Sequence, residues 1–171
     1  GLSDYDIAST LATSISQRLV RRLCKECRKE RDFNEDEKRI IESIAKRYNV
    51  EFDLSGKTYD AVGCPHCNNT GYYDRIGVFE ILNVTDEVKQ EILNGKSSIE
   101  IRNIALEQNY KPLVVDGIKK IIQGHTTLEE LNKKQVVDLD EERKAAVVSN
   151  LLVVLCGNHD AQPIVNSGSF Y

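Results

Sequence analysis

Residues 64–80, CPHCNNTGYYDRIGVFE, place two cysteines two residues apart, before a tight turn and a run rich in β-branched and aromatic residues. A pair with the same spacing, Cys24 and Cys27, lies upstream. Two intervening residues let both sulfurs of a pair face one ion, and two pairs supply the four thiolates of tetrahedral zinc. We therefore predict a zinc site formed by Cys24, Cys27, Cys64 and Cys67. It is structural, because four thiolates leave no open coordination position.

The remaining cysteine and the histidines are assigned no ligand role. His66 lies inside the second pair and is expected at the surface, and Cys156 is a lone thiol in an apolar run. His125 and His159 are expected to be solvent-exposed. Five cysteines, four of them in two pairs, fit a reducing compartment with a metal site better than a disulfide framework. Ordinary buried cysteines or a redox pair are the alternative.

Basic residues are frequent in residues 18–31, beside the first cysteine pair. Zinc with four thiolates carries a net charge of about −2, which nearby cations offset while they favour thiolate over thiol. Nucleic-acid binding is the alternative, but Glu26 and Glu30 interrupt the run, aromatic residues are absent from it, and the formal charge of the chain is −4. We expect no nucleic-acid partner. The cations in question are Arg21, Arg22, Lys25, Arg28 and Lys29.

The tetrapeptide SGKT at residues 55–58 is similar to the end of a phosphate-binding P-loop. A P-loop needs a glycine five positions before Gly56, and that position is Glu51, whose charge would repel phosphates. We interpret SGKT as a polar turn. No catalytic set of residues stands out, so we predict no catalytic or ATP-binding residue in this chain.

The bulk composition is that of a soluble protein. The 171 residues allow one ordinary domain or two small ones, and 40% hydrophobic content allows a packed core. No stretch approaches about 20 apolar residues, so no transmembrane helix is expected, and the N-terminus is not expected to be a signal peptide. The sequence contains no methionine, from which we infer an excised or processed fragment.

Residues 3–23 are predicted to form one helix. Ser3 is a suitable N-cap, and apolar residues recur every four positions, which we interpret as one helical stripe. The stripe consists of Ile7, Leu11, Ile15 and Leu19.

A second helix is predicted over residues 34–48, where Asn34 and Glu37 form a pattern typical of a capping box. Residues 49–63 are expected to form a loop, and residues 71–82 a strand.

The following segment is predicted to contain only short helices. One begins at Thr85 and ends at Gly95, one is capped by Ser97, one begins at Pro112, and one is capped by Thr126 with Glu129. Residues 135–171 contain a helix candidate capped by Asp138, although its β-branched run leaves a strand possible. The predicted fold class is mainly α with a small β element, a zinc-stapled subdomain followed by a packet of short helices.

Three stretches together resemble one family, the ATPases of type II secretion and type IV pilus assembly (GspE/PilB). They are IASTLATSISQRLVRRLCKEC at 7–27, CPHCNNTGYYDRIGVFEIL at 64–82 and LVVDGIKKIIQGHTTLEEL at 113–131, in the family's order. The resemblance implies a parent that is a hexameric ATPase, cytoplasmic and peripheral to the inner membrane. Only the four paired cysteines carry over, as zinc ligands. The family's ATP-binding motifs are expected upstream of Gly1, so ATP and Mg²⁺ belong to the parent enzyme.

The resemblance also implies a division of the chain. Residues 1–23 would end the motor domain, residues 24–83 would form the tetracysteine subdomain, and residues 84–134 the C-terminal helical subdomain. Residues 135–171 extend past the family's usual end as a tail without an assigned role. Because the apolar stripe should pack on a motor core, we expect it to be covered here by residues 147–155 or by a second chain.

The expected partners are adjacent subunits of a homo-hexamer and the inner-membrane platform protein of the machinery. The sequence leaves open whether that machinery secretes proteins or assembles pili. The alternative is a stand-alone zinc module that binds nucleic acid or unfolded protein, as zinc ribbons and DnaJ-type chaperone modules do. Those chaperone modules carry four glycine-rich repeats, whereas this chain has two cysteine pairs.

Overall fold

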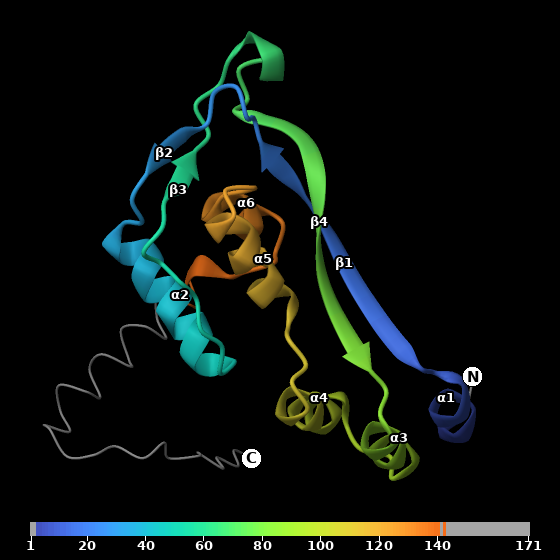
Figure 1. The fold of residues 1–171 in the computed structure, drawn as a ribbon. Coiled ribbons are helices and arrows are strands. Elements are labelled where there is room, and N and C mark those ends of the chain that lie inside the picture. The colour runs from blue at the N-terminus through green and yellow to red at the C-terminus, as the bar shows by residue number, and fades with distance from the viewer. Residues whose placement is uncertain (1–2, 141, 143–171) are drawn as a thin grey trace, which may run out of the picture.

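Two long strands form an antiparallel ribbon along one side of the molecule (Figure 1). β1 (Thr13–Leu23) pairs with β4 (Tyr72–Asn83) along nearly the whole length of both strands. The register shifts once, between Arg21 and Leu23, shortly before the first cysteine pair. Such irregularities bend a strand, so the chain turns where the cysteines begin.

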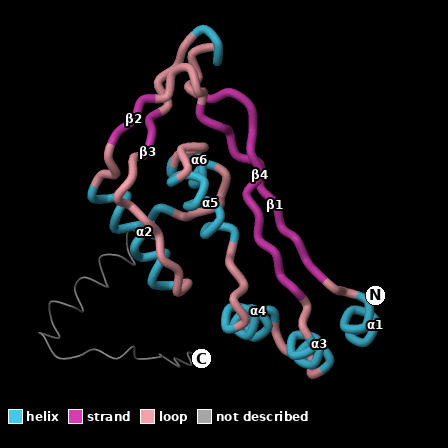
Figure 2. The backbone as a smooth tube through the Cα atoms, in the orientation of Figure 1, coloured by secondary structure: helices cyan, strands magenta, loops and turns pink. Residues whose placement is uncertain are grey.

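A second, shorter antiparallel pair joins β2 (Lys29–Arg31) to β3 (Thr58–Asp60). A single turn of 3-10 helix, η1 (Pro65–Cys67), follows β3 and precedes β4. The loop that connects β1 to β2 and the segment that carries η1 meet at one end of the long ribbon (Figure 2). Both cysteine pairs belong to these two segments.

The computed structural model describes residues 3–140 and 142, which contain six α-helices. They are α1 (Asp4–Thr10), α2 (Glu35–Arg47), α3 (Asp86–Leu93), α4 (Ser98–Glu107), α5 (Leu113–Ile122) and α6 (Leu128–Lys133). The predicted mainly helical fold class with a small β element is confirmed. The β element is nevertheless larger than expected, because one long strand was predicted as a helix.

The prediction of one helix over residues 3–23 is wrong beyond its first turns. Ser3 caps α1 through a reciprocal box with Asp6, but α1 ends at Thr10 and the chain continues as β1. A recurrence every four residues approximates one helical turn and is also a multiple of the two-residue strand period. The pattern therefore did not distinguish the two structures, and pairing with β4 decides in favour of the strand.

The predicted stripe also does not face the core. Leu11 is 38% exposed, Ile15 is 62% exposed and Leu19 is 49% exposed. The buried residues of β1 are instead Val20 and Leu23. The long ribbon consequently has one face toward the protein interior and one face whose apolar side chains contact solvent.

The helix predicted over residues 34–48 is confirmed as α2, with the expected capping box between Asn34 and Glu37. Thr85 caps α3 and Ser97 caps α4 as predicted, and Pro112 immediately precedes α5. The last cap is displaced by one residue from the prediction. Thr127, not Thr126, caps α6, because the hydroxyl of Thr126 donates to a carbonyl of β1 instead.

Two further predictions concern the loop at residues 49–63 and the segment after Asp138. The expected loop at residues 49–63 is mostly irregular but includes β3, which the sequence pattern did not indicate. The candidate helix after Asp138 falls largely outside the described residues, as do the apolar run that follows it, Cys156 and His159.

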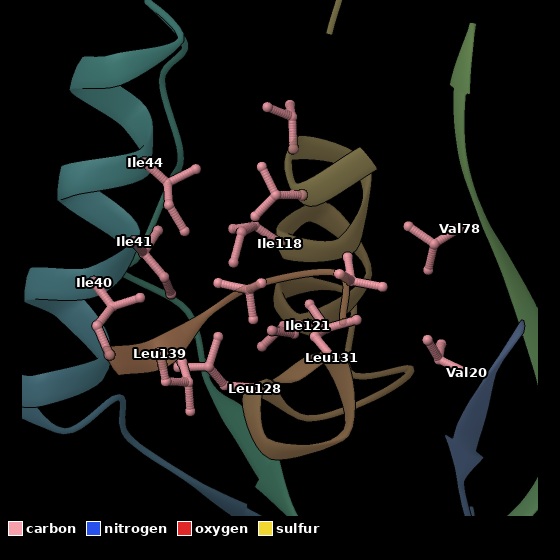
Figure 3. Packing of buried hydrophobic residues seen from close by; sticks show 14 of the residues in the cluster. Val20, Ile40, Ile41, Ile44, Val78, Ile118, Ile121, Leu128, Leu131 and Leu139 are labelled. Carbon is pink, nitrogen blue, oxygen red and sulfur yellow. The ribbon is translucent and has the colours of Figure 1, made fainter. Parts of the chain in front are cut away.

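One apolar core joins α2 to the ribbon, with α5 and α6 between them (Figure 3). The isoleucines of α2 point toward α5, and Val20 and Val78 approach from the two strands. Ile118 of α5 lies at the centre and is completely buried. The helices near the chain's end and the strand that leads to the first cysteine pair are therefore packed into one unit.

The end of β1 is fastened by residues 125–130, here called the clamp segment. The carboxylate of Glu130, whose side chain is fully buried, accepts from the backbone N–H of Arg21 at 3.0 Å and from its Nε and Nη2 at 2.8 and 2.6 Å. The carbonyl of Arg21 accepts from Thr126 at 3.0 Å. The N–H of Leu23 donates to the carbonyl of His125 at 2.8 Å. These contacts fix the backbone directly before Cys24.

The clamp segment also reaches the start of β4. The hydroxyls of Tyr72 and Thr127 are 2.9 Å apart, and the guanidinium of Arg21 lies 4.0 Å above the Tyr72 ring. Burial alone would raise the pKa of Glu130, but the hydrogen bonds from Arg21 outweigh it and hold the pKa below its usual value. Glu130 is thus a buried carboxylate that stays charged because Arg21 is present.

We expect Ile118→Ala to lower the free energy of unfolding by about 2–5 kcal/mol, because it leaves a cavity at the centre of the core. Ile99 of α4 is 71% exposed, so Ile99→Ala should change that free energy by no more than about 0.5 kcal/mol. Urea denaturation followed by circular dichroism measures both. Similar losses from the two variants would contradict the position of the core.

Removing the two partners of the clamp ion pair should have unequal effects. Arg21→Ala leaves a buried carboxylate without its cation, and we expect a loss of about 3–5 kcal/mol in the free energy of unfolding. Glu130→Gln leaves a guanidinium whose side chain is 37% exposed and can be hydrated, so the loss should be smaller. The same urea titrations at pH 7 compare the variants. Equal losses, or a larger loss from Glu130→Gln, would show that Glu130 is not the buried charge.

Candidate metal centre

The four paired cysteines meet at the end of the ribbon. The Sγ atoms of Cys24 and Cys64 are 3.9 Å apart, those of Cys27 and Cys67 are 3.8 Å apart, and those of Cys64 and Cys67 are 3.7 Å apart. All four sulfurs lie within 4.8 Å of one another. Tetrahedral zinc with Zn–S bonds of about 2.3 Å places its sulfurs about 3.8 Å apart. The cluster has the size of a tetrahedral metal site, and all four thiols are free of disulfides.

The first pair follows directly from the end of β1. The N–H of Cys24 donates to the carbonyl of Gly71 at 3.0 Å, which extends the contact between the two long strands by one bond. The carbonyl of Cys24 then accepts from the N–H groups of Cys27 and Arg28, at 3.4 and 3.0 Å. This tight turn directs both sulfurs of the pair to the same side.

The second pair lies in η1, where Pro65 occupies the first helical position. Asn68 ends the turn in the left-handed conformation with φ of 52°. Gly71 has φ of +76°, and a Cβ there would lie 2.7 Å from the Cβ of Ala61. The tight turn in the sequence CNNTG thus requires residues that tolerate positive φ, which Asn and Gly do.

Three backbone N–H groups point at the sulfurs. Gly63 donates to the Sγ of Cys27 at 3.3 Å, and Cys64 and Gly71 each donate to the Sγ of Cys67 at 3.3 Å. Burial alone would raise the pKa of the Cys67 thiol, but these backbone hydrogen bonds outweigh it and bring the pKa to about 6. A negative charge on Cys67 is therefore favoured at neutral pH.

The Cys27 thiol behaves differently in the absence of a cation. Burial raises the pKa of Cys27 to about 12, and the hydrogen bond from Gly63 opposes this only in part. Adjacent thiolates repel one another, so a negative charge on Cys67 opposes ionisation of Cys27. A bound divalent cation lets the remaining thiols ionise, and its binding should release protons.

Two of the basic residues near the first pair, Arg21 and Arg28, have contacts within the fold. Arg28 donates to the carbonyl of Gly124, and its guanidinium lies 4.3 Å above the Tyr59 ring. His125, expected at the surface, is half-buried, because its carbonyl binds the end of β1. Burial lowers the pKa of its imidazole, and four nearby cations lower it further; these are Arg22, Arg28, Lys120 and Lys25.

His66 lies outside the sulfur cluster, as predicted. It is exposed and packs against Tyr73, with ring centroids 4.3 Å apart. The described residues that could hold a metal ion at this centre are the four cysteines. All four donors are thiols, which suit zinc and favour a closed site.

The SGKT tetrapeptide lies in a bend that leads into β3 rather than in a loop that opens a helix. The N–H and hydroxyl of Ser55 both donate to Asp53, at 2.9 and 2.6 Å, and Lys57 forms an ion pair with Asp32 at 2.7 Å. A P-loop lysine must instead be available to phosphates in front of a helix N-terminus. In the described residues 55–58, Lys57 is paired with Asp32 and a strand follows instead of a helix.

Sequence reasoning missed the residues that support the cysteines. The N–H groups of Gly63 and Gly71 were not recognised as hydrogen-bond donors to the sulfurs. One glycine directly precedes Cys64 and the other follows Cys67 by four residues, and glycines in such places often mark a close approach of the backbone to another group. Glu130 was also missed, because acidic residues near a helix start usually contact solvent or cap the helix.

Within the described residues, no helix is both long and apolar enough to cross a bilayer.

Comparison with known proteins relates the chain to one family. Residues 1–133 match the family model of the type II/IV secretion system protein. The chain is 38% identical over 132 residues to the type IV pilus assembly ATPase PilB of Thermus thermophilus, covering 77% of this chain and 14% of the relative. It is 32% identical over 131 residues to the type II secretion system protein HxcR of Pseudomonas aeruginosa, covering 77% and 23%. It is 30% identical over 131 residues to the type II secretion system protein E of Aeromonas hydrophila, covering 77% and 25%.

The chain therefore spans a quarter or less of the length of these relatives. The family match nevertheless includes both cysteine pairs, the long ribbon and all six helices. With more than half of its residues inside that match, the chain belongs to the type II/IV secretion system protein family, whose relatives here are ATPases of pilus assembly and proteins of type II secretion.

Proposed function

We propose that this chain is the metal-binding and C-terminal part of an ATPase that powers type II secretion or type IV pilus assembly. One combined observation carries the proposal: residues 1–133 match the family model, and the matched region contains four cysteine sulfurs at the spacing of a tetrahedral metal site. In this proposal the chain has a structural and coupling role. The nucleotide site is supplied by another part of the enzyme.

Zinc is the metal we propose, held by Cys24, Cys27, Cys64 and Cys67. The donor set supports it, because four thiolates select soft or borderline cations such as zinc over magnesium or calcium. The N–H groups that point at Cys27 and Cys67 would stabilise the thiolate charge around the ion. A closed four-sulfur site has no position for water or substrate, so the metal would fix geometry rather than take part in a reaction.

The contacts of β1 suggest how such a centre would be used. The strand runs from the core at Val20 through the clamp at Arg21 directly to Cys24. In the whole enzyme, residues 1–23 would end the motor domain, so a movement of the motor would reach the metal centre through this short, fixed connection. Residues 24–83 and 84–134 would then form the metal-binding and helical subdomains, and residues 135–171 an additional tail.

The oligomeric state, location and partners proposed for the parent enzyme are those that the family resemblance implies. We propose that the parent enzyme is a homo-hexamer in the cytoplasm, peripheral to the inner membrane, with adjacent subunits and the platform protein of the machinery as partners. ATP and Mg²⁺ would bind the parent's motor domain, and no residue of this chain is proposed as catalytic. Nucleic acid is not a proposed partner. A stand-alone zinc module that binds nucleic acid or unfolded protein is disfavoured by the family match.

We expect one zinc ion per chain in purified protein. The apparent binding free energy of structural zinc is roughly 10–16 kcal/mol, and because binding is coupled to folding, the folded chain should retain its metal. Cys64→Ser should lose the metal and weaken amide protection in residues 24–67. His66→Ser, a change inside the same pair at an exposed residue, should retain it. Elemental analysis and hydrogen exchange provide the readouts. Full metal content in Cys64→Ser, or a metal-free wild-type chain with the same fold, would contradict the assignment.

The chain alone should neither bind nor hydrolyse ATP, because SGKT lies in a bend before a strand and Ser55 and Lys57 already have acidic partners. Titration with ATP and Mg²⁺, followed by amide NMR shifts, tests this expectation. Saturable shifts at residues 55–58 with micromolar ATP would contradict it. Tight binding of single-stranded nucleic acid or of an unfolded protein by the same sample would instead favour the stand-alone zinc module.

A domain exchange tests the function itself. Residues 1–133 should replace the matching region of the Thermus thermophilus pilus ATPase and keep pilus assembly, since the two are 38% identical there. The same exchange with Cys24→Ser and Cys27→Ser should lose piliation while each subunit still binds nucleotide. Normal piliation by this second exchange would show that the centre is dispensable. Loss of nucleotide binding in a folded subunit would place the metal centre inside the catalytic unit, contrary to the proposal.

A further inference from the structure

One turn of the chain touches every segment that enters or leaves the two cysteine pairs. It joins α5 to α6, consists of Gly124 followed by the clamp segment, and is here called the α5–α6 turn. Its clamp segment binds residues 21–23, which lead into the first pair. The other contacts come from one residue after the first pair, one before the second pair and one after it. These residues are Arg28, Tyr59 and Tyr72.

Arg28 makes the contact directly after the first pair. Its Nη1 donates to the carbonyl of Gly124, and its guanidinium lies 4.3 Å above the Tyr59 ring. The hydroxyl of Tyr59 donates in turn to Glu30 at 3.3 Å, and these two residues stand opposite each other in the β2–β3 pair. The Tyr59 ring therefore connects the α5–α6 turn to both short strands, which lead away from the first pair and toward the second.

The Tyr59 ring fits against the turn because residue 124 is glycine. A Cβ at this position would lie 2.5 Å from Cε2 and 2.7 Å from Cδ2 of the ring, and 3.0 Å from Nη1 of Arg28. The two ring distances are shorter than ordinary carbon contacts, so any side chain would force the ring to move. Gly124 is also buried and has φ of +70°. The fit between the turn and the segments around the cysteines is tightest at this residue.

We propose that the α5–α6 turn positions both cysteine pairs and thereby sets the affinity of the centre for zinc. Groups that orient metal ligands without touching the metal commonly change metal affinity when they are altered. By holding the segments on both sides of each pair, the turn keeps the four sulfurs close together before the ion arrives. Less ordering is then needed on binding, which favours the bound state. This role rests on the zinc site of the proposed function.

The coupling between the turn and the metal must be reciprocal. If the turn raises the affinity for zinc, bound zinc stabilises the turn by the same factor. Because α6 begins inside the clamp segment, at Leu128, this helix should respond to the metal. α4 packs beside α3 at the other end of the ribbon (Figure 1) and should not respond.

The zinc affinity of the full chain, measured by competition with a chromophoric chelator, tests the proposal. Gly124→Ala should raise the dissociation constant for zinc about tenfold or more, because the added methyl group displaces the Tyr59 ring. Gly95→Ala is the matched control. Gly95 follows the end of α3 as Gly124 follows the end of α5, and its φ is +69°, but a Cβ there meets no atom within 4 Å. The control introduces similar backbone strain far from the centre and should leave the constant within about twofold.

A milder pair of variants keeps the test decisive if Gly124→Ala does not fold. Tyr72→Phe removes the hydroxyl that lies 2.9 Å from that of Thr127, and it should raise the dissociation constant about threefold to tenfold. Tyr73→Phe makes the same change at the next residue of β4, whose ring packs on His66 instead of the turn, and should leave the constant unchanged. Circular dichroism of the zinc-loaded variants should match the wild-type spectrum.

Amide exchange with and without zinc tests the reverse direction. Removal of zinc should speed exchange in α6, for example at Leu131, whose N–H donates to the carbonyl of Thr127, and should leave α4 unchanged.

Several results would overturn the proposal while leaving the zinc site intact. They are an unchanged zinc constant in Tyr72→Phe or in a folded Gly124→Ala, an equal weakening by Gly95→Ala, and exchange in α6 that does not respond to zinc. A wild-type chain that binds no zinc would overturn both this role of the turn and the zinc site itself.

Discussion

The metal centre depends on the antiparallel register between β1 and β4. Leu23 stands opposite Tyr72, and one bond further the N–H of Cys24 reaches the carbonyl of Gly71. This register brings together two cysteine pairs that are far apart in the sequence. A slip of one residue would turn the core face of β1 to the solvent, so the burial of Val20 also fixes where the first pair lies.

The end of the ribbon needs more than apolar packing. Along the sequence, the central core includes Val20 before and Phe33 after the first pair, and Leu54 before and Ile76 after the second, but no residue of 21–32 or 55–75. These segments are held by the clamp, by the short β2–β3 pair and by the four sulfurs. Small units that bury little apolar area commonly rely on a metal, and this arrangement explains why the cysteines occur beyond the core.

The sequence predicted features that depend on local chemistry. Cysteine spacing predicted the four residues of the cluster, and capping residues predicted α2, α3 and α4. Residues 11–23 were misassigned, because apolar residues four apart fit both periods and only the distant strand β4 decides between them. The clamp could not be predicted, because burial of Glu130 follows from how α6 packs beside β1.

X-ray absorption at the zinc edge of the purified chain tests the central claim, that four cysteines hold one zinc ion, most directly. The account predicts a first shell of four sulfur atoms at about 2.3 Å with no nitrogen or oxygen ligand. A shell that contains nitrogen or oxygen, or fewer than four sulfurs, would contradict it, as would a folded chain that binds no zinc.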